Sequence, residues 1–199
     1  YFARVKVDPG ELRTNNRVVY TVVEGPRVRI RDIEMEGNEY FSDFWLRQEI
    51  ASTARLWPIV SGYMDAEEVR RDVQKLRTKY VDEGFLDCEV ARRLDFNDDK
   101  TRVTLTFVIN EGPRYRVADV RFVGNEVFSG AELAERIRLH PGEYYTSEAV
   151  RRDVKRLQDT YGELGYVYAS VRADRRYKQT PGEVDLVFTV EESDQYRVG

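Results

Sequence analysis

The sequence predicts an α+β protein built from tandem β-α-α-β-β units, each a three-stranded mixed sheet covered on one face by two antiparallel helices. Two internal repeats support this prediction. Residues 24–42 recur at 111–129 with eleven of nineteen positions identical, and residues 69–85 recur at 150–166. Self-similarity at a period of roughly 80–90 residues indicates an array of structural units. Units of this size bury a limited core and are expected to be modestly stable alone.

The composition narrows the class of protein. Of the 199 residues, 41% are hydrophobic and 34% are charged, and the net charge is −4. A general nucleic-acid binder would carry a basic field, so no nucleic-acid partner is expected. The single cysteine, Cys88, permits no intrachain disulfide and is expected to be a small buried residue. No apolar run is long enough for a transmembrane helix and no signal peptide is visible. The chain begins at Tyr1 inside a segment with the pattern of a strand, so we expect an excised fragment.

The second unit begins with a strand over residues 116–123, which are rich in β-branched and aromatic residues and end at the turn pair Gly124-Asn125. Ser129 precedes Glu132 by three residues, which is the spacing of a helix capping box. A first helix is therefore expected from Ser129, with Leu133 and Ile137 on one face. It is expected to end near residues 140–142, where proline and glycine stop it.

The second helix of this unit is predicted from a cap at Thr146 and one apolar stripe. That stripe is Val150, Val154, Leu157 and Tyr161, at the spacing of one helix face. Gly165 stands where a left-handed C-terminal cap is expected. The equivalent stripe of the first unit is Val69, Val73, Leu76 and Tyr80, followed by Gly84.

Two strands complete each unit. In the second unit they cover residues 168–175 and a segment with Val184, Leu186, Phe188 and Val190 facing inward, joined by a turn at 179–182. In the first unit they cover 88–94 and the alternation Val103, Leu105, Phe107 and Ile109, joined by a turn at 97–99. Residues 1–23 supply two strands of an earlier unit, with Val18, Tyr20 and Val22 facing inward. The expected domains are a preceding hairpin at 1–24, full units at 25–111 and 112–192, and a tail or following unit at 193–199.

The motifs of the two units, taken in order, resemble those of POTRA (polypeptide-transport-associated) domains. Each unit has G-N-x-x-F-S, at residues 37–42 and 124–129, then a D-V-x-x-L-x-x-x-Y-x-x-x-G run followed by an aromatic residue, and an E-G-P junction at 24–26 and 111–113. At the exit of the second unit, residues 192–194 replace E-G-P.

The resemblance implies periplasmic arms of an outer-membrane β-barrel protein of the insertase type. Such arms guide unfolded outer-membrane protein precursors and dock accessory assembly proteins, and they need no cofactor. Two alternatives stay open. One is the arm of a two-partner secretion transporter. The other is a structural or division-type scaffold that holds one fixed partner.

An open sheet edge is the expected binding surface. Two helices cover one face of a small sheet but not its outer edge, whose free N–H and C=O groups can pair with an incoming chain. The resemblance implies that the strand after the second helix is this edge, and arginines in it would discourage pairing between copies. The candidate peptide-binding residues are Glu89, Val90, Ala91, Arg92, Arg93, Leu94, Ser170, Val171, Arg172, Ala173, Asp174 and Arg175.

Two further features concern partners and joints. The interhelix loop of the first unit carries six residues that the second unit lacks, and it is apolar: Leu56, Trp57, Pro58, Ile59 and Val60. It either packs on its own or a neighbouring unit or docks a partner, since exposed apolar patches mark interaction sites. The unit junctions contain the candidate hinge residues Gly25, Pro26, Gly112 and Pro113, in which glycine permits bending and proline restricts it.

The second helices also carry many basic residues. They form either a solvated face, partly compensated by acids that include Asp72 and Asp153, or a contact with anionic lipid at a membrane surface. These basic residues are Arg70, Arg71, Lys75, Arg77, Lys79, Arg151, Arg152, Lys155 and Arg156.

Motifs for chemistry are lacking. His140 has no second histidine or nearby cysteine, and the turn at 97–99 lacks the further ligands of a calcium loop. The acid pairs 67–68 and 191–192 are expected to face solvent. Without a nucleophile or phosphate-loop motif, the sequence predicts no enzyme and no catalytic, metal or cofactor-binding residues.

Overall fold

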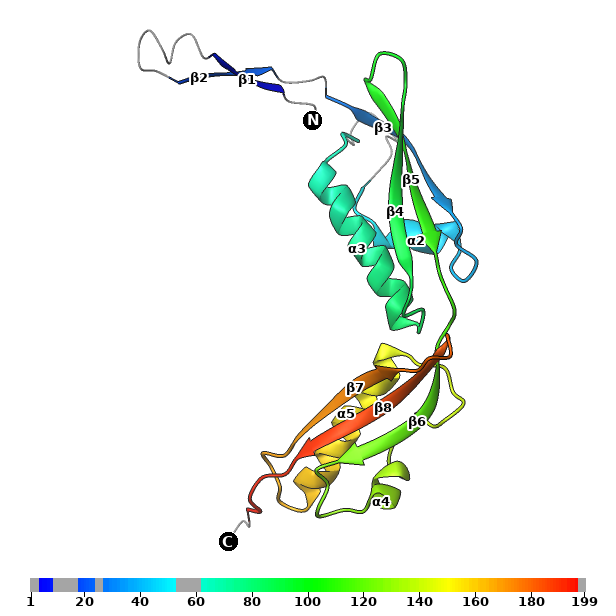
Figure 1. Ribbon diagram of the computed structural model, residues 1–199, viewed down its shortest axis with the longest axis vertical. Helices are drawn as coiled ribbons and strands as arrows, with labels where there is room; N and C mark the ends of the chain where they lie inside the picture. Colours follow the sequence, from blue (N-terminus) through cyan, green and yellow to red (C-terminus); the bar gives the residue numbers. More distant parts are fainter. Residues whose placement is uncertain (1–3, 9–17, 24–26, 53–61, 197–199) are drawn as a thin grey trace. The chain divides into compact units, whose positions relative to one another are not determined.

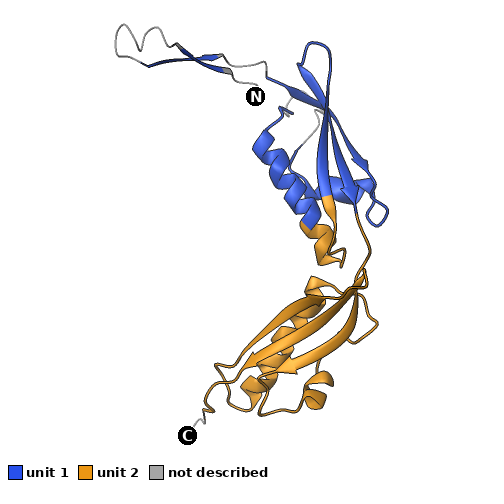
Figure 2. Ribbon diagram, viewed as in Figure 1, with its two compact units in different colours: residues 1–77, 90–110 blue, residues 78–89, 111–199 orange. Residues whose placement is uncertain are grey.

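The computed structural model describes residues 4–8, 18–23, 27–52 and 62–196. The chain divides into two compact units (Figure 2). Unit 1 comprises Tyr1–Arg77 and Val90–Asn110, and unit 2 comprises Thr78–Glu89 and Glu111–Gly199. Residues 78–82, the end of a helix that starts at Ala66, and the loop that follows them thus belong to unit 2.

Unit 1 contains a three-stranded mixed sheet and two helices (Figure 1). The helices are α2 (Asp43–Glu49) and α3 (Ala66–Asp82), whose last residues extend into unit 2. The strands are β3 (Arg29–Glu36), β4 (Glu89–Phe96) and β5 (Arg102–Asn110). Their order is β3-β5-β4, and β3 runs parallel to the central β5.

Unit 2 has the same architecture. Its strands are β6 (Arg116–Val123), β7 (Ser170–Tyr177) and β8 (Glu183–Glu191), in the order β6-β8-β7, with β6 parallel and β7 antiparallel to β8. Its helices are α4 (Gly130–Ala134) and α5 (Ser147–Glu163). The predicted fold class is therefore confirmed, and strands predicted at 88–94 and 168–175 are each found one or two residues later.

The cores lie between the helices and the sheets. All eight inward residues predicted for the central strands are buried, and so are Val69, Leu76, Tyr80, Leu157 and Tyr161 on the helices. Val73, Val150 and Val154 are partly buried. The predicted stripes therefore face the cores, and these three valines lie near their margins.

The G-N-x-x-F-S motif builds the turn between the first strand and the first helix. Gly124 has φ +79°, and a Cβ there would collide with the carbonyl oxygen of Val190. Asn125 Nδ2 donates a hydrogen bond to the Phe128 carbonyl oxygen at 2.8 Å. The Phe128 ring packs edge-on against Tyr161, with ring centroids 5.1 Å apart. Ser129 and Glu132 form the predicted capping box. The motif therefore has a structural role.

The first helix of unit 2 is shorter than predicted. It ends at Ala134, so Ile137 lies outside it, although Ile137 is buried. The cause is Asp153 on α5, whose two carboxylate oxygens each accept a backbone N–H at 2.9 Å, one from Arg138 and one from Leu139. Those N–H groups therefore bond to a side chain in place of a helical carbonyl.

Unit 1 uses the same device. Asp72 on α3 accepts the N–H groups of Ala51 and Ser52, both at 2.8 Å. Asp72 is 0% and Asp153 1% exposed. The prediction that these two acids lie on a solvated helix face was wrong, because their carboxylates terminate the interhelix loops.

A third acid, Glu192, also departs from the prediction. Glu192 was expected to face solvent, but it is partly buried and its Oε1 accepts three hydrogen bonds. The donors are the backbone N–H groups of Glu126 and Val127, at 2.9 and 3.0 Å, and the Tyr161 hydroxyl, at 2.9 Å. Burial, together with this carboxylate, raises the pKa of Tyr161. Glu192 thus ties the end of β8 to α5.

The N-terminal residues form the predicted pair of strands, β1 (Arg4–Asp8) and β2 (Val19–Val23), which are antiparallel. The prediction of an inward face was wrong, since Val18, Tyr20 and Val22 are all exposed. In the part of the chain that the structure describes, no helix covers this two-stranded sheet. Its side chains therefore have no core to pack against there.

Candidate binding surfaces

β4 and β7 each lie at an edge of their sheet (Figure 1). The candidate residues 89–94 fall within β4, and 170–175 fall within β7. Most of their side chains are exposed or partly buried, and Val171 is buried. The opposite edges are formed by β3 and β6. The geometry thus brings each predicted segment to a sheet edge, in equivalent positions of the two units.

β7 is paired along its whole length on one side only. Its eight residues run in continuous antiparallel register with β8, from Ser170 opposite Glu191 to Tyr177 opposite Val184. Within the described residues, no strand pairs with its other side. In a strand, backbone polar groups point alternately to the two sides, so about half of those in β7 point away from β8. These are the groups that an added strand would use.

The edge arginines are held by nearby groups. Arg93 on β4 forms ion pairs with Glu36 at 2.9 Å and with Asp95 at 3.3 Å, and hydrogen bonds to these carboxylates raise the pKa of Arg93. Arg92 donates to the Ala66 carbonyl oxygen at 3.3 Å. On β7, Arg172 pairs with Glu191 at 2.6 Å, and the Arg175 guanidinium lies 5.6 Å from the Tyr145 ring centroid.

Many basic residues of α3 and α5 have carboxylate partners. Four ion pairs join residues of the same helix. On α3, Arg70 pairs with Glu67 at 2.8 Å and Lys75 with Asp72 at 3.7 Å. On α5, Arg152 pairs with Glu148, and Lys155 with Asp159 at 3.2 Å. The arrangement favours the interpretation of a solvated, charge-compensated helix face over a field that attracts anionic lipid.

An exposed aromatic pair on α2 was missed in the sequence. Phe44 and Trp45 are 68% and 60% exposed, and their rings meet edge-on with centroids 6.4 Å apart. The second unit has Ala131 and Glu132 at the matching positions. The signal was present, because both aromatic residues directly precede the buried Leu46 and therefore lie off the core-facing position of a short helix.

Two of the predicted features lie outside the described residues: the apolar loop at 56–60 and the hinge residues Gly25 and Pro26. At the second junction, Gly112 adopts φ +66° and Pro113 is exposed. The backbone conformation at Gly112 lies in the left-handed region that favours glycine.

The residues considered for chemistry are dispersed. His140 is exposed, and its backbone N–H donates to Glu143 at 2.9 Å. Cys88 is buried, as predicted. Within the described residues, no three His, Cys, Asp or Glu side chains are grouped so that they could hold a metal ion. The described helices include none with the length and apolar character needed to cross a membrane.

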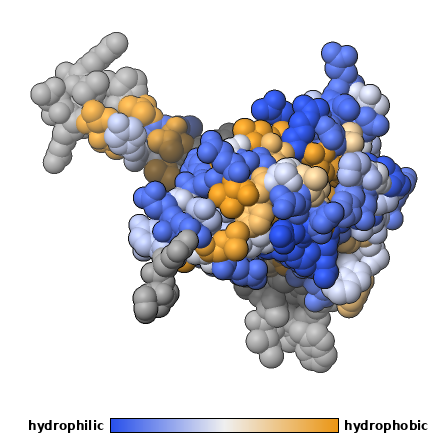
Figure 3. Space-filling view, turned by 90° about the horizontal axis from the view of Figure 1, so that it is seen from below, coloured by the Kyte–Doolittle hydropathy of each residue, from blue (hydrophilic) through white to orange (hydrophobic). Residues whose placement is uncertain are grey.

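The surface of the molecule is mixed in character. Figure 3, seen from below, shows hydrophobic patches set among hydrophilic surface. In unit 2 the exposed large hydrophobic residues include Leu164, Val167, Tyr168 and Tyr196. The rings of Tyr168 and Tyr196 meet edge-on with centroids 5.4 Å apart.

Comparison of the sequence with known proteins identifies a family. The POTRA family, described as "Surface antigen variable number repeat", matches residues 28–112 and 115–193. The outer membrane protein assembly factor BamA of Neisseria meningitidis serogroup B is 28% identical over 177 residues, which are 86% of this chain and 22% of that protein. BamA of Buchnera aphidicola is 25% identical over 195 residues, which are 92% of this chain and 31% of that protein. The chain thus spans less than a third of the length of these relatives.

Solved structures agree on the fold. The crystal structure of BamA from Haemophilus ducreyi lacking POTRA domains 1–3 matches with a TM-score of 0.57 at 21% identity, covering 84% of this chain and 29% of that chain. POTRA domains 3–5 of Haemophilus influenzae BamA match with a TM-score of 0.54 at 22% identity, covering 85% of this chain and 67% of that chain. Since the two family matches together span most of the sequence and coincide with the two repeats, this chain belongs to the POTRA family.

Proposed function

We propose that the chain is part of the periplasmic region of an outer-membrane protein assembly factor. There it would bind extended segments of unfolded outer-membrane proteins and dock accessory assembly proteins. Relatives that match most of the chain are named outer membrane protein assembly factors. The observation that carries the proposal is the equivalent position of β4 and β7, each at the edge of its sheet. The proposed role is binding rather than catalysis, and it needs no cofactor.

Strand addition gives this surface a mechanism. A client strand of about five residues would make several backbone hydrogen bonds, each contributing about 0.5–1.5 kcal/mol net. Ordering a disordered client offsets much of this gain, so binding at one edge is weak. A client that engages both β4 and β7 gains affinity through effective concentration. Main-chain pairing tolerates many sequences, which suits a receiver of many clients.

The side chains of the edges favour clients over self-association. Arg93 and Arg172 pair with carboxylates of their own unit, whereas Arg92 contacts a carbonyl oxygen and Arg175 an aromatic ring. Within the described residues, Arg92 and Arg175 have no carboxylate partner, so their positive charges remain uncompensated beside the edge. Two copies aligned edge to edge would bring these like charges together. A barrel segment, with few charges on its lipid-facing positions, meets no such penalty.

Accessory proteins would use a different surface. The exposed Phe44 and Trp45 on α2 supply apolar area of the kind that anchors protein interfaces. The apolar loop at 56–60 is a second candidate, and the junction residues Gly25, Pro26, Gly112 and Pro113 would act as the joints between units bounded at 25–111 and 112–192. The double change Phe44→Ala with Trp45→Glu, which installs the residues of the second unit, should leave the fold intact and weaken accessory docking. Accessory docking that is unchanged in this variant would remove the surface from the proposal.

Proline substitution tests the edge mechanism. Neighbouring residues of a strand point their N–H groups to opposite sides, so one of Ala91→Pro and Arg92→Pro removes an outward N–H from β4. Ala173→Pro and Arg172→Pro form the matched pair on β7. We expect one proline of each pair to lower affinity for a labelled outer-membrane strand peptide while the sheet stays folded, and the other to destabilise the sheet. If every folded variant binds as the unchanged chain does, the edges are not the binding surface.

A further inference from the structure

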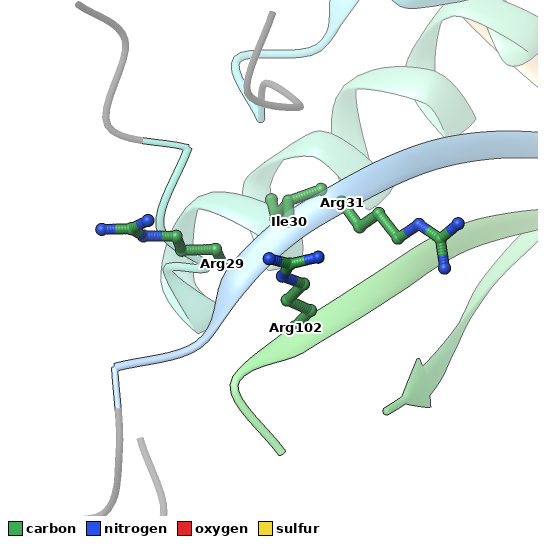
Figure 4. A pocket seen from close by; sticks show the side chains of 4 residues that line it. All are labelled: Arg29, Ile30, Arg31 and Arg102. Carbon is green, nitrogen blue, oxygen red and sulfur yellow. The ribbon is translucent and has the colours of Figure 1, made fainter. Parts of the chain in front are cut away.

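A cluster of arginines lines an open pocket in unit 1 at the start of β3. The pocket has a volume of about 210 Å³ and is lined by Arg29, Ile30, Arg31 and Arg102 (Figure 4). A neighbouring pocket of about 250 Å³ shares Arg29 and Arg102 and adds Arg27, Tyr63 and Thr101. The two pockets thus form one continuous, basic surface.

Strand pairing creates this cluster. β3 and β5 are parallel, and their register places Arg29 directly opposite Arg102. The register then shifts between Ile30 and Asp32, so Arg31 is the extra residue of a bulge. A bulge re-aims the side chain that it carries. Figure 4 shows the Arg29 and Arg31 guanidiniums extending to opposite sides, with that of Arg102 between them. This arrangement keeps the like charges apart, since like charges repel each other.

The positive charge of this cluster has little local compensation. Within the described residues, Arg29, Arg31 and Arg102 form no ion pair, in contrast to Arg93 on β4 and Arg172 on β7. Arg29 donates to the Tyr63 hydroxyl at 3.1 Å, and its guanidinium lies 5.2 Å from the centroid of that ring. This hydrogen bond is the main cause that lowers the pKa of Tyr63. The nearby Asp99 accepts a hydrogen bond of 2.6 Å from the Thr101 hydroxyl. The hydrogen bonds from Thr101 are the main cause that lowers the pKa of Asp99, and the charge of Arg102 contributes less.

Unit 2 provides an internal comparison. Its equivalent strands place Arg116 opposite Glu183, where unit 1 has Arg29 opposite Arg102. The bulge residue is Ala118 in place of Arg31. The Arg116–Tyr144 contact repeats the Arg29–Tyr63 contact, with 3.8 Å from guanidinium to ring centroid. The arginine–tyrosine pair is therefore common to both units, whereas the excess of positive charge belongs to unit 1 alone.

We propose that Arg29, Arg31 and Arg102 form a binding site for a phosphate-type oxyanion, either free or carried on a lipid head group. Guanidinium groups bind phosphate oxygens through paired, charge-assisted hydrogen bonds. Three such groups match the several oxygens and the higher charge of a phosphate better than the two oxygens and single charge of a carboxylate. A pocket of about 210 Å³ suits one small group, because pockets for larger ligands begin near roughly 300 Å³.

The test is a titration of the full chain with inorganic phosphate at constant ionic strength, followed by backbone amide signals. We expect saturable shifts at Arg29, Arg31, Tyr63 and Arg102. The double variant Arg31→Ala with Arg102→Glu, which installs the unit 2 residues, should weaken phosphate binding at least tenfold. The variant Arg47→Glu with Arg71→Ala makes the same change in net charge at exposed arginines elsewhere in unit 1 and should bind normally.

Further experiments distinguish a free phosphate from a lipid head group and test whether arginine is required. Phosphatidylcholine vesicles with and without phosphatidic acid show whether the phosphate is a lipid head group: binding to the phosphatidic acid vesicles that is lost in Arg31→Ala/Arg102→Glu supports the lipid source. Shifts with inorganic phosphate and no vesicle binding support the free ion. Replacing Arg31 and Arg102 by lysine should also weaken binding, since lysine lacks the paired donors. The proposal is overturned if the lysine variant binds phosphate as tightly as the unchanged chain, or if Arg31→Ala/Arg102→Glu leaves phosphate binding unchanged. It is also overturned if an acidic peptide saturates the site at a lower concentration than phosphate does.

Discussion

The hydroxyl of Tyr115 donates a hydrogen bond of 2.6 Å to Oδ2 of Asp87. Both residues belong to unit 2, and the Tyr115 ring is buried there, edge-on to Tyr177. The backbone strengthens this contact, because the Tyr115 N–H donates to the Gly84 carbonyl oxygen at 2.8 Å. The loop that follows α3 is therefore part of the unit 2 packing.

This contact predicts a pH dependence of stability. The hydrogen bond to Asp87 and, second, burial raise the pKa of Tyr115 from 10.0 to about 12. The folded state thus favours the neutral phenol, so the contribution of Tyr115 is complete below the unfolded pKa near 10 and is lost as the pH rises through about 12. Urea unfolding of the full chain, followed by unit 2 methyl signals, should show stability falling between these pH values.

The control for this prediction is Tyr115→Phe. Its loss of stability over the same pH range should be smaller, while the part that comes from Tyr161 remains. Tyr168→Phe, at an exposed position, should behave as the unchanged chain does. An identical pH profile in Tyr115→Phe would show that the hydrogen bond to Asp87 does not control this titration.

The buried aspartates predict a large loss on truncation. Asp153→Ala would leave the N–H groups of Arg138 and Leu139 without their acceptors, at a cost of about 2–4 kcal/mol. Asp159→Ala removes only an exposed ion pair with Lys155 and should cost less than about 1 kcal/mol. The free energy of unfolding from urea titrations measures both. Similar small losses in the two variants would contradict the role assigned to Asp153.

The loop after α3 predicts a contrast between matched residues. Leu86 is 6% exposed and belongs to the unit 2 core cluster, whereas its repeat equivalent Val167 is 59% exposed. Leu86→Ala should therefore destabilise unit 2 by about 2–5 kcal/mol. Val167→Ala should stay within about 0.5 kcal/mol. Hydrogen exchange of β6 and β8 amides reports unit 2 alone, and equal protection in the two variants would exclude Leu86 from its core.

Most of the fold could be predicted from the sequence because the patterns that indicate it are local. The alternation in β8, the stripe on α5 and the capping box at Ser129 each lie within a few residues, and all three were confirmed. The buried aspartates also had a local signal. Asp72 and Asp153 follow Val69 and Val150 by three positions, which places them on the core side of their helices.

The other features depended on long-range pairing. The contact of Arg29 with Arg102 requires the register of two strands more than 70 residues apart. The early end of α4 at Ala134 depends on a side chain from another helix, Asp153. Local propensity does not encode such contacts. The candidate edge residues could be placed in strands from the sequence, and the family resemblance supplied their position at the sheet edge.

The most direct test of the proposed function is a map of amide chemical shifts in the full chain with an unfolded peptide from an outer-membrane β-strand. The control is the same peptide with alternate backbone amides N-methylated, which blocks strand pairing. Strand addition predicts shifts concentrated at residues 89–94 of β4 and 170–175 of β7, and their loss with the methylated peptide. Shifts that cluster on α3 and α5, leave both edges untouched and persist with the methylated peptide would contradict it.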